Sequence, residues 1–201
     1  MSLFEQNSWK QQGVDYVIKH IPGEPRWGVF SPEEIALASD PSQVERIKTI
    51  RSGDVEKIRG LERIHCCDLT TEPITQSDFM VSNNGFDIPV TSYCLTSQKE
   101  NSNKPAVLYY HGGGWCYGDR AVVENPCRLL AQYAGAIVFS TEYRLAPEHK
   151  YPTGPNDCYA VLRYVYEHAD EFGIDKTRII VSGDSAGGNL SAVLSHKDRN
   201  N

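Results

Sequence analysis

The chain has 201 residues, of which 40% are hydrophobic and 23% are charged, and its formal net charge is −6 at pH 7. This composition is typical of one globular domain with a sizeable core. A net negative charge argues against the basic surface that binds nucleic acid or anionic lipid, so we expect neither partner.

Targeting and cysteine patterns also restrict the class of protein. No stretch approaches the roughly 20 apolar residues of a membrane span, and residues 1–12 lack the layout of a cleavable signal, so we expect no span and a cytoplasmic location. The cysteines show no Cys-x-x-Cys spacing, which indicates neither a zinc site nor a dense disulfide framework. They are Cys66, Cys67, Cys94, Cys116, Cys127 and Cys158.

Residues 2–64 are helix-prone, and Ser31 followed by Pro32 is a good helix start. Apolar residues recur there at helical spacing: Val44, Ile47, Ile50, Val55, Ile58 and Leu61. The next segments, 78–82 and 86–95, predict a β-hairpin, because Asn84-Gly85 between them supplies the positive φ angles of a tight turn.

Beyond the hairpin, a polar loop at 98–104 precedes the unbroken apolar run 106–110, which predicts a buried strand. Asn125 and Pro126 suit the N-cap and first position of a helix whose apolar face carries Leu129, Leu130 and Tyr133. A buried strand is expected at 137–141. An amphipathic helix is expected at 157–170, with one side formed by Cys158, Val161, Leu162, Val165 and Ala169. This alternation predicts a parallel sheet with crossover helices.

The segment 179–194 carries the chemistry: an apolar strand, a Gly-flanked turn that holds Ser185, and then an apolar-periodic helix. This strand–turn–helix layout is that of a nucleophile elbow, so Ser185 is the candidate nucleophile. Gly183 and Gly187 leave room for the bend, and the amide of Ala186 lies at a helix N-terminus that favours negative charge. By itself, Gly-x-Ser-x-Gly occurs by chance in roughly one random chain of this length in fifteen.

A second glycine cluster supplies the context: His111, Gly112, Gly113, Gly114 and Trp115 follow the 106–110 strand directly. Bare backbone amides after a strand can form the other half of an oxyanion hole. The order of the two motifs, with Glu142–Glu148 and Tyr151-Pro152 between them, resembles the hormone-sensitive-lipase-like group of α/β-hydrolases, which includes bacterial carboxylesterases and arylacetamide deacetylases. The resemblance covers about residues 78–194.

This resemblance implies an α/β-hydrolase fold with a mostly parallel sheet and helices on both faces. It also implies an enzyme that hydrolyses small carboxylic esters through an acyl-serine intermediate, without a metal or cofactor. It assigns the oxyanion donors Gly113, Gly114 and Ala186. The supporting motif residues are His111, which would order the loop, Gly112, Gly183, Asp184 and Gly187. Structural polar contacts are implied for Glu142, Arg144, Glu148 and Asp157.

The resemblance also implies that residues 1–65 form an N-terminal helical cap and residues 66–201 the N-terminal portion of the core. Four aromatic residues of the cap are candidates to line an acyl pocket, although packing the cap is the commoner role for each of them. They are Trp9, Tyr16, Trp27 and Phe30.

The triad base and acid are missing from their expected places. In this fold they follow the nucleophile, but after Ser185 the chain offers only His196 and Asp198. A helix through His196 would place it roughly 16 Å from Ser185, far beyond hydrogen-bond reach. His149 and His168 fall on a loop and a helix face. We therefore expect an incomplete copy of the fold, with an exposed apolar edge at 179–181 and little or no activity by itself.

Three alternatives are compatible with parts of this pattern. A trypsin-like protease is discarded, because Ala186 breaks the Gly-Asp-Ser-Gly-Gly pattern and the predicted elements alternate as in α/β proteins. A non-catalytic ligand-binding member of the same fold stays open, since a chain without a base and an acid could still bind an acyl or aromatic ligand. The last alternative is a chain that does not fold stably in isolation.

Overall fold

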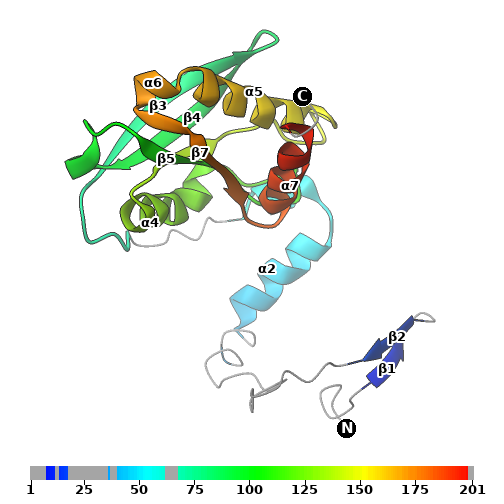
Figure 1. Ribbon diagram of the computed structural model, residues 1–201. Helices are drawn as coiled ribbons and strands as arrows, with labels where there is room; N and C mark the ends of the chain where they lie inside the picture. The colour runs from blue at the N-terminus through cyan, green and yellow to red at the C-terminus, as the bar shows by residue number, and fades with distance from the viewer. Residues whose placement is uncertain (1–7, 12–13, 18–35, 37–39, 62–67, 199–201) are drawn as a thin grey trace. The chain divides into compact units, whose positions relative to one another are not determined.

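The structure is a computed structural model that describes residues 8–11, 14–17, 36, 40–61 and 68–198 (Figure 1). The chain divides into two compact units, residues 1–54 and 55–201. The first unit contains β1 (Ser8–Gln11), β2 (Val14–Val17) and α2 (Pro41–Arg51). The second contains α3 (Val55–Arg59), β3 (Ile74–Asn83), β4 (Phe86–Leu95), η2 (Thr96–Gln98), β5 (Lys104–Tyr110), η3 (Arg120–Val123), α4 (Glu124–Ala134), β6 (Ile137–Thr141), α5 (Thr153–Glu167), α6 (Ala169–Phe172), β7 (Ile174–Gly183) and α7 (Ala186–Asp198).

The first unit corrects the expectation that its whole length is helix-prone. β1 and β2 pair as antiparallel strands, with Ser8 opposite Val17, because the Val-Asp-Tyr-Val run of β2 is rich in β-branched and aromatic residues. The helical periodicity farther along the chain is confirmed by α2 and α3. Helix α2 starts where Asp40 accepts hydrogen bonds from the backbone N–H groups of Ser42 and Gln43, at 2.8 and 3.4 Å.

Several expectations for the N-terminal segment lie outside the described residues. They concern the helix start at Ser31, the side chains of Trp9, Tyr16, Trp27 and Phe30, and the cap boundary between residues 65 and 66.

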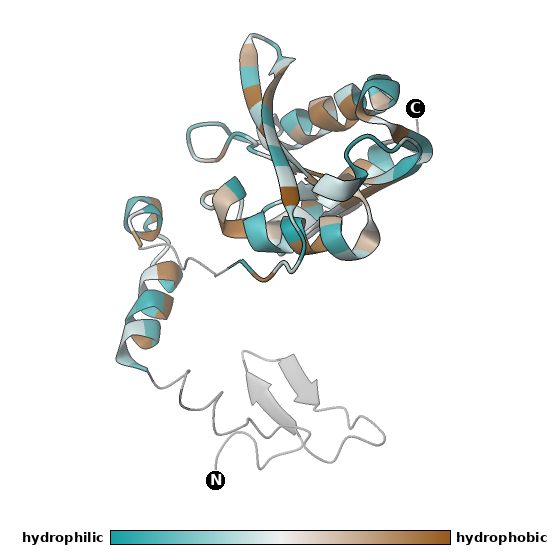
Figure 2. Ribbon diagram, turned by 90° about the vertical axis from the view of Figure 1, so that its left-hand side faces the viewer, coloured by the Kyte–Doolittle hydropathy of each residue, from teal (hydrophilic) through white to brown (hydrophobic). Residues whose placement is uncertain are grey.

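The second unit is built on one sheet with strand order β3-β4-β6-β5-β7. The predicted hairpin is confirmed: β3 and β4 pair antiparallel, and Asn84 and Gly85 in the turn have φ angles of 51° and 81°. Bands of hydrophobic and hydrophilic residues alternate along this hairpin in Figure 2, as expected for strands with one buried face. β5 is parallel to both β6 and β7, and β4 is antiparallel to β6.

Strand β5 has core side chains on both faces of the sheet. Ala106, Leu108 and Tyr110 pack in a cluster with residues of α5, α6 and α7. Val107 and Tyr109 face the opposite way and pack with residues of α4. The predicted α/β-hydrolase fold, with helices on both faces of the sheet, is thus confirmed (Figure 1).

Two helix starts differ from the sequence prediction. Helix α4 begins at Glu124, and the preceding residue Val123 makes no side-chain capping bond. A cap is not needed there, because the single-turn helix η3, which Asp119 caps, runs directly into α4. Asn125 is therefore inside the helix, and its side chain accepts a hydrogen bond from the N–H of Leu69. Tyr133, expected on the apolar face, is 76% exposed. Helix α5 begins at Thr153, earlier than the predicted residue 157.

Strand β7 is longer than predicted and lies at the end of the strand order, next to β5. Its Ile180 side chain is 55% exposed. A groove of about 630 Å³ follows this edge, lined by residues that include Leu162, Ile179 and Leu194. The apolar edge expected at residues 179–181 is present.

Candidate active site

Ser185 occupies the turn between β7 and α7 and is exposed. Its φ angle is +51°, a left-handed conformation that is uncommon for a residue with a side chain and costs on the order of 1–3 kcal/mol. The carbonyl of Ser185 accepts a hydrogen bond from the N–H of Asn189, so the first turn of α7 starts directly from the serine. The strand–serine–helix geometry of an elbow is present.

The two flanking glycines are required by a close approach to β5. A Cβ at Gly183 would lie 2.4 Å from the carbonyl oxygen of Tyr110, and a Cβ at Gly187 would lie 1.8 Å from the same atom. Real Cβ atoms do not come this close to backbone oxygen, so both positions exclude a side chain. The space that a side chain at either glycine would occupy is therefore filled by the backbone at the C-terminal end of β5.

The glycine-rich loop leaves the end of β5 beside the elbow. Gly113 and Gly114 have φ angles of +119° and +59°, and Trp115 follows at +60°. The carbonyl of Gly113 accepts hydrogen bonds from the N–H groups of Cys116 and Tyr117, at 3.1 and 3.0 Å. A Cβ at Gly113 would lie 1.9 Å from the Tyr117 carbonyl oxygen, so this tight loop also excludes a side chain.

Asp184 joins the two halves of the site. Its carboxylate Oδ1 accepts a hydrogen bond of 3.0 Å from the backbone N–H of Gly112. A Cβ at Gly112 would lie 2.2 Å from Oδ2 of the same carboxylate, which explains why this position also needs glycine. The resemblance named Asp184 as a supporting motif residue, but the sequence gave no sign of this partner, which lies 72 residues earlier in the chain.

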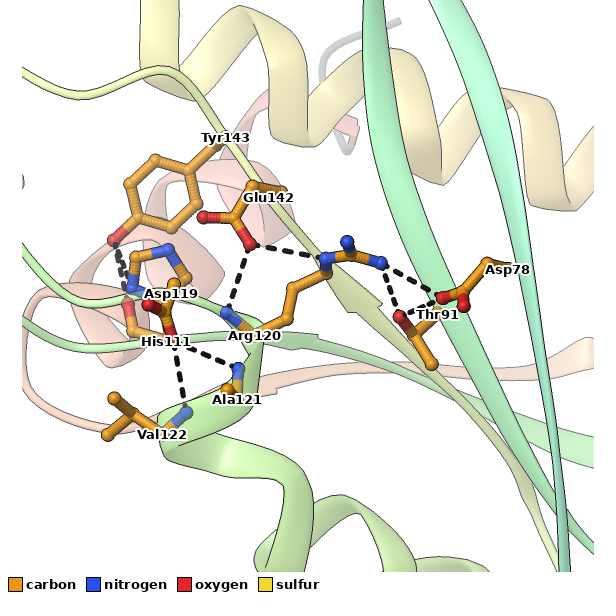
Figure 3. A network of polar contacts seen from close by, with 9 residues as sticks. All are labelled: Asp78, Thr91, His111, Asp119, Arg120, Ala121, Val122, Glu142 and Tyr143. Carbon is orange, nitrogen blue, oxygen red and sulfur yellow. Dashed lines mark hydrogen bonds and ion pairs between the residues drawn. The ribbon is translucent and has the colours of Figure 1, made fainter. Parts of the chain in front are cut away.

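His111 is completely buried behind the loop. Its ring stacks on Tyr143 with 4.3 Å between centroids, and its Nδ1 lies 2.8 Å from the Gly112 carbonyl oxygen. The Tyr143 hydroxyl donates to the His111 carbonyl at 2.7 Å (Figure 3), and burial raises the pKa of this hydroxyl. His111 Nε2 has no hydrogen-bond partner among the described residues. The ring therefore contacts the loop backbone.

The polar residues implied by the resemblance form structural networks. Glu142 accepts hydrogen bonds from the Nε and backbone N–H of Arg120, whose guanidinium also reaches Asp78 and Thr91 (Figure 3). These contacts join β3, β4 and the segment after the glycine loop.

A second network lies beneath the loop that follows β6. Asp157 is completely buried and accepts hydrogen bonds from Nε and Nη2 of Arg144, at 2.8 and 2.7 Å. Asn83 donates to the same carboxylate at 2.7 Å. The bonds with Asp157 raise the pKa of the Arg144 guanidinium. The pair fixes the loop to α5 and to the hairpin.

Arg59 on α3 makes a third set of contacts, which sequence reasoning missed. Its Nε donates to the carbonyl of Cys116 at 2.8 Å, and its Nη2 donates to the carbonyl of Ala146 at 2.9 Å. The same guanidinium binds Glu148 through both carboxylate oxygens, at 2.7 and 3.0 Å. This ion pair lowers the pKa of Glu148 to about 2. Since Arg59 and Glu148 are 89 residues apart, no local pattern could have indicated the contact.

The hydrogen bonds that His111 and His168 make with described residues go to partners other than Ser185. His196 is on α7, eleven residues after Ser185, which corresponds to roughly 16 Å along the helix axis. His168 stacks on Tyr164, and its Nδ1 lies 2.8 Å from the Tyr164 carbonyl oxygen. His149 is on the loop before α5, and His20 and His65 lie outside the described residues. Among the described residues, no hydrogen bond joins a histidine to the Ser185 side chain.

An elbow serine whose neighbour Asp184 bonds a glycine-rich loop, at the ends of adjacent parallel strands, is typical of the nucleophile half of an α/β-hydrolase site. The sequence model of a protein family described as alpha/beta hydrolase fold matches residues 107–201. This match covers just under half of the chain, and the relatives below agree with the resemblance to the hormone-sensitive-lipase-like group of α/β-hydrolases.

Relatives of known class match beyond that segment. Carboxylesterase NlhH from Mycobacterium tuberculosis is 50% identical over 113 residues, 56% of this chain and 35% of the relative. Arylacetamide deacetylase from Bos taurus is 38% identical over 130 residues, 62% of this chain and 32% of the relative. The crystal structure of EstE1, a thermostable carboxylesterase cloned from a metagenomic library, is 39% identical with a TM-score of 0.61, over 81% of this chain and 51% of that one. The chain thus spans about a third to a half of the length of these relatives.

Proposed function

We propose that this protein is a serine carboxylic-ester hydrolase that works through an acyl-serine intermediate. The observation that carries the proposal is the strained Ser185 at the start of α7, tied to the glycine-rich loop by the bond from the Gly112 N–H to Asp184. A strained backbone conformation of this kind persists only where the surrounding structure holds it in place, and such residues cluster at active sites.

In the proposed reaction, the Ser185 Oγ attacks the ester carbonyl carbon while its proton passes to a general base. The negative charge that develops on the carbonyl oxygen is stabilised by the backbone N–H groups of Gly113, Gly114 and Ala186. One such donor is typically worth about 2.7–4 kcal/mol in the transition state. The alcohol then leaves with a proton, and water hydrolyses the acyl-serine.

His111, Gly112, Gly183, Asp184 and Gly187 would support this chemistry by holding the two donor segments together. No residue in this set is assigned a proton-transfer step. The proposed substrate is a small ester, without a metal or cofactor. Within the described ranges, no helix combines the length and the apolar character of a membrane span. The proposal keeps the cytoplasmic location expected from the sequence, which fractionation of expressing cells would test.

The binding alternative is favoured by one observation: the described residues contain no base positioned for Ser185. Both readings can be separated with a fluorophosphonate probe, because covalent labelling requires an activated serine, whereas a binding protein requires only a pocket. Hydrolysis of p-nitrophenyl acetate should be followed in parallel, on the 201-residue chain and on any longer product of its gene.

The matched variants are Ser185→Ala and Ser195→Ala, since Ser195 is an exposed serine on α7, the helix that Ser185 precedes. The esterase proposal expects labelling and ester turnover that Ser185→Ala abolishes and Ser195→Ala preserves. Equal rates of the two variants in a gene product that hydrolyses the ester, or no labelling of Ser185 in any gene product, would contradict it.

A further inference from the structure

The two glycines proposed as oxyanion donors lie in a run of three left-handed residues. Gly113, Gly114 and Trp115 have φ angles of +119°, +59° and +60°. For Trp115, which has a side chain, this conformation is strained and persists only where surrounding contacts fix it. The Trp115 ring is 45% exposed and lines a pocket of about 380 Å³ beside Gly114, so packing of the ring contributes little. The backbone contacts of the loop therefore decide where the glycine N–H groups point.

Contacts from outside the loop hold the peptide groups that follow this run. The Trp115 carbonyl accepts a hydrogen bond of 2.9 Å from the N–H of Ala146. The next carbonyl, that of Cys116, accepts one of 2.8 Å from Arg59 Nε. Arg59 Nη2 also donates to the Ala146 carbonyl at 2.9 Å. One guanidinium thus holds both the loop and the residue that bonds Trp115, and the four residues form a closed ring of contacts.

Glu148 fixes the direction of this guanidinium. Its two carboxylate oxygens accept hydrogen bonds from Nη1 and Nη2 of Arg59, at 2.7 and 3.0 Å. A bidentate pair of this kind sets orientation as well as distance. The bond with Glu148 raises the pKa of Arg59, so the group stays charged at neutral pH. A planar fork serves two carbonyls and a carboxylate at once, whereas the donors of a lysine ammonium radiate from one atom.

We propose that Arg59 is a positioning residue of the oxyanion hole, which holds the Gly113 and Gly114 N–H groups in place through the carbonyls of Cys116 and Ala146. This inference rests on the proposed ester hydrolysis. It goes beyond that reaction by giving helix α3, which precedes the whole sheet in the chain, a part in the function of the site. Arg59 acts through the loop backbone and not by contact with the ester.

Amide hydrogen exchange measured by NMR tests the state of the loop without requiring turnover. The N–H groups of Cys116 and Tyr117 donate to the Gly113 carbonyl, at 3.1 and 3.0 Å. Their exchange rates therefore report the opening of the turn that carries the donors. The N–H of Asn189, which donates to the Ser185 carbonyl at 3.1 Å, serves as a reference in the elbow.

The informative variant is Arg59→Lys, which keeps a positive charge beside Glu148 but loses the planar fork. Arg128→Lys is the matched control, because it makes the same chemical change in another paired arginine. Arg128 lies on α4 and forms an ion pair of 2.7 Å with Asp68 in the segment before β3. Thermal unfolding followed by circular dichroism checks that both variants fold.

In the 201-residue chain, Arg59→Lys should speed exchange at Cys116 and Tyr117 by about tenfold and leave Asn189 unchanged. Arg128→Lys should change none of the three rates. The melting temperature of Arg59→Lys should stay close to that of wild type, because the exposed ion pair with Glu148 is kept.

In a gene product that hydrolyses p-nitrophenyl acetate, Arg59→Lys should lower kcat by about tenfold while KM stays within about twofold. This split is expected because oxyanion donors act on the charge that develops in the transition state. Arg59→Gln should lower kcat equally and also lower the melting temperature. A purely structural role of Arg59 predicts a lower melting temperature with kcat unchanged in the folded enzyme.

Unchanged exchange in Arg59→Lys, an equal increase in Arg128→Lys, or a raised KM at constant kcat would overturn the inference. Failure of the proposed function has a different signature, which is no fluorophosphonate labelling of Ser185 in any gene product. That result, together with faster exchange in Arg59→Lys, would keep Arg59 as an anchor of the loop and remove its role at an oxyanion.

Discussion

Replacing Gly187 with alanine should destabilise the second unit strongly, although glycine to alanine inside a helix ordinarily stabilises by about 1 kcal/mol. A Cβ at Gly187 would lie 1.8 Å from the Tyr110 carbonyl oxygen, 2.6 Å from its carbonyl carbon and 2.9 Å from the His111 carbonyl oxygen. All three atoms belong to the backbone at the end of β5. Because backbone atoms cannot rotate aside, the steric clash is relieved only if α7 moves away from the sheet.

Overpacking of this kind costs about 3 kcal/mol or more after the helix-propensity gain is subtracted. For a chain of this size, that cost corresponds to a melting temperature lower by roughly 6–12 °C.

Gly188→Ala is the matched control, because it makes the same chemical change one position along the same helix. The nearest atom to a Cβ at Gly188 is the Gly183 carbonyl oxygen at 3.2 Å, a tight contact that a small shift relieves. We expect its free energy of unfolding to stay within about 1 kcal/mol of wild type. Urea and thermal unfolding, followed by circular dichroism, measure both variants. Equal stability of Gly187→Ala and Gly188→Ala would refute the close approach of α7 to the end of β5.

Three further predictions concern charge and the sheet edge. Asp157→Ala should lower the free energy of unfolding by about 3–5 kcal/mol in urea titrations, since it leaves Arg144 without its buried partner; the exposed Asp170→Ala should change it by less than about 0.5 kcal/mol, and similar losses in both would contradict the network. The pKa of Glu148 is lowered from 4.5 to about 2, first by its bond with Arg59, so this pair stabilises the fold above about pH 4.5 and the contribution is lost as pH falls toward 2. Arg59→Gln should therefore be less stable than wild type at pH 7, with a gap that narrows below about pH 4.5 in thermal unfolding; a gap independent of pH would assign the loss to the carbonyl contacts instead. Ile180→Lys should reduce the aggregation measured by light scattering without lowering the free energy of unfolding. Ile179→Lys should lower the free energy of unfolding, because it places a charge among core side chains. The same behaviour of both variants would show that the Ile180 side chain is not exposed at the sheet edge.

Sequence reasoning succeeded where the determinants are local. Asn84 and Gly85 specify the hairpin turn through their own positive φ angles. The unbroken apolar run of β5 predicts a strand that is buried on both faces. The elbow was found for the same reason, because its strand, turn and helix are contiguous.

The misses share a different cause. Asn125 resembles an N-cap in sequence, but η3 already precedes it and supplies the helix start. Arg59 lies on an unremarkable five-residue helix, and its three partners come from loops that only the folded sheet brings together. The pocket beside Gly114 was missed likewise, since no single segment forms it.

The bond between Gly112 and Asp184 has a consequence for how the site is assembled. It joins residues 72 positions apart, and these residues follow two strands that pair side by side in the sheet. The ends of so long a loop meet late, because its closure entropy is not offset until β7 docks on β5. During synthesis, the glycine loop is therefore made and released from the ribosome well before the carboxylate that fixes it, and the two parts of the site become one structure only when the strand carrying Ser185 has emerged.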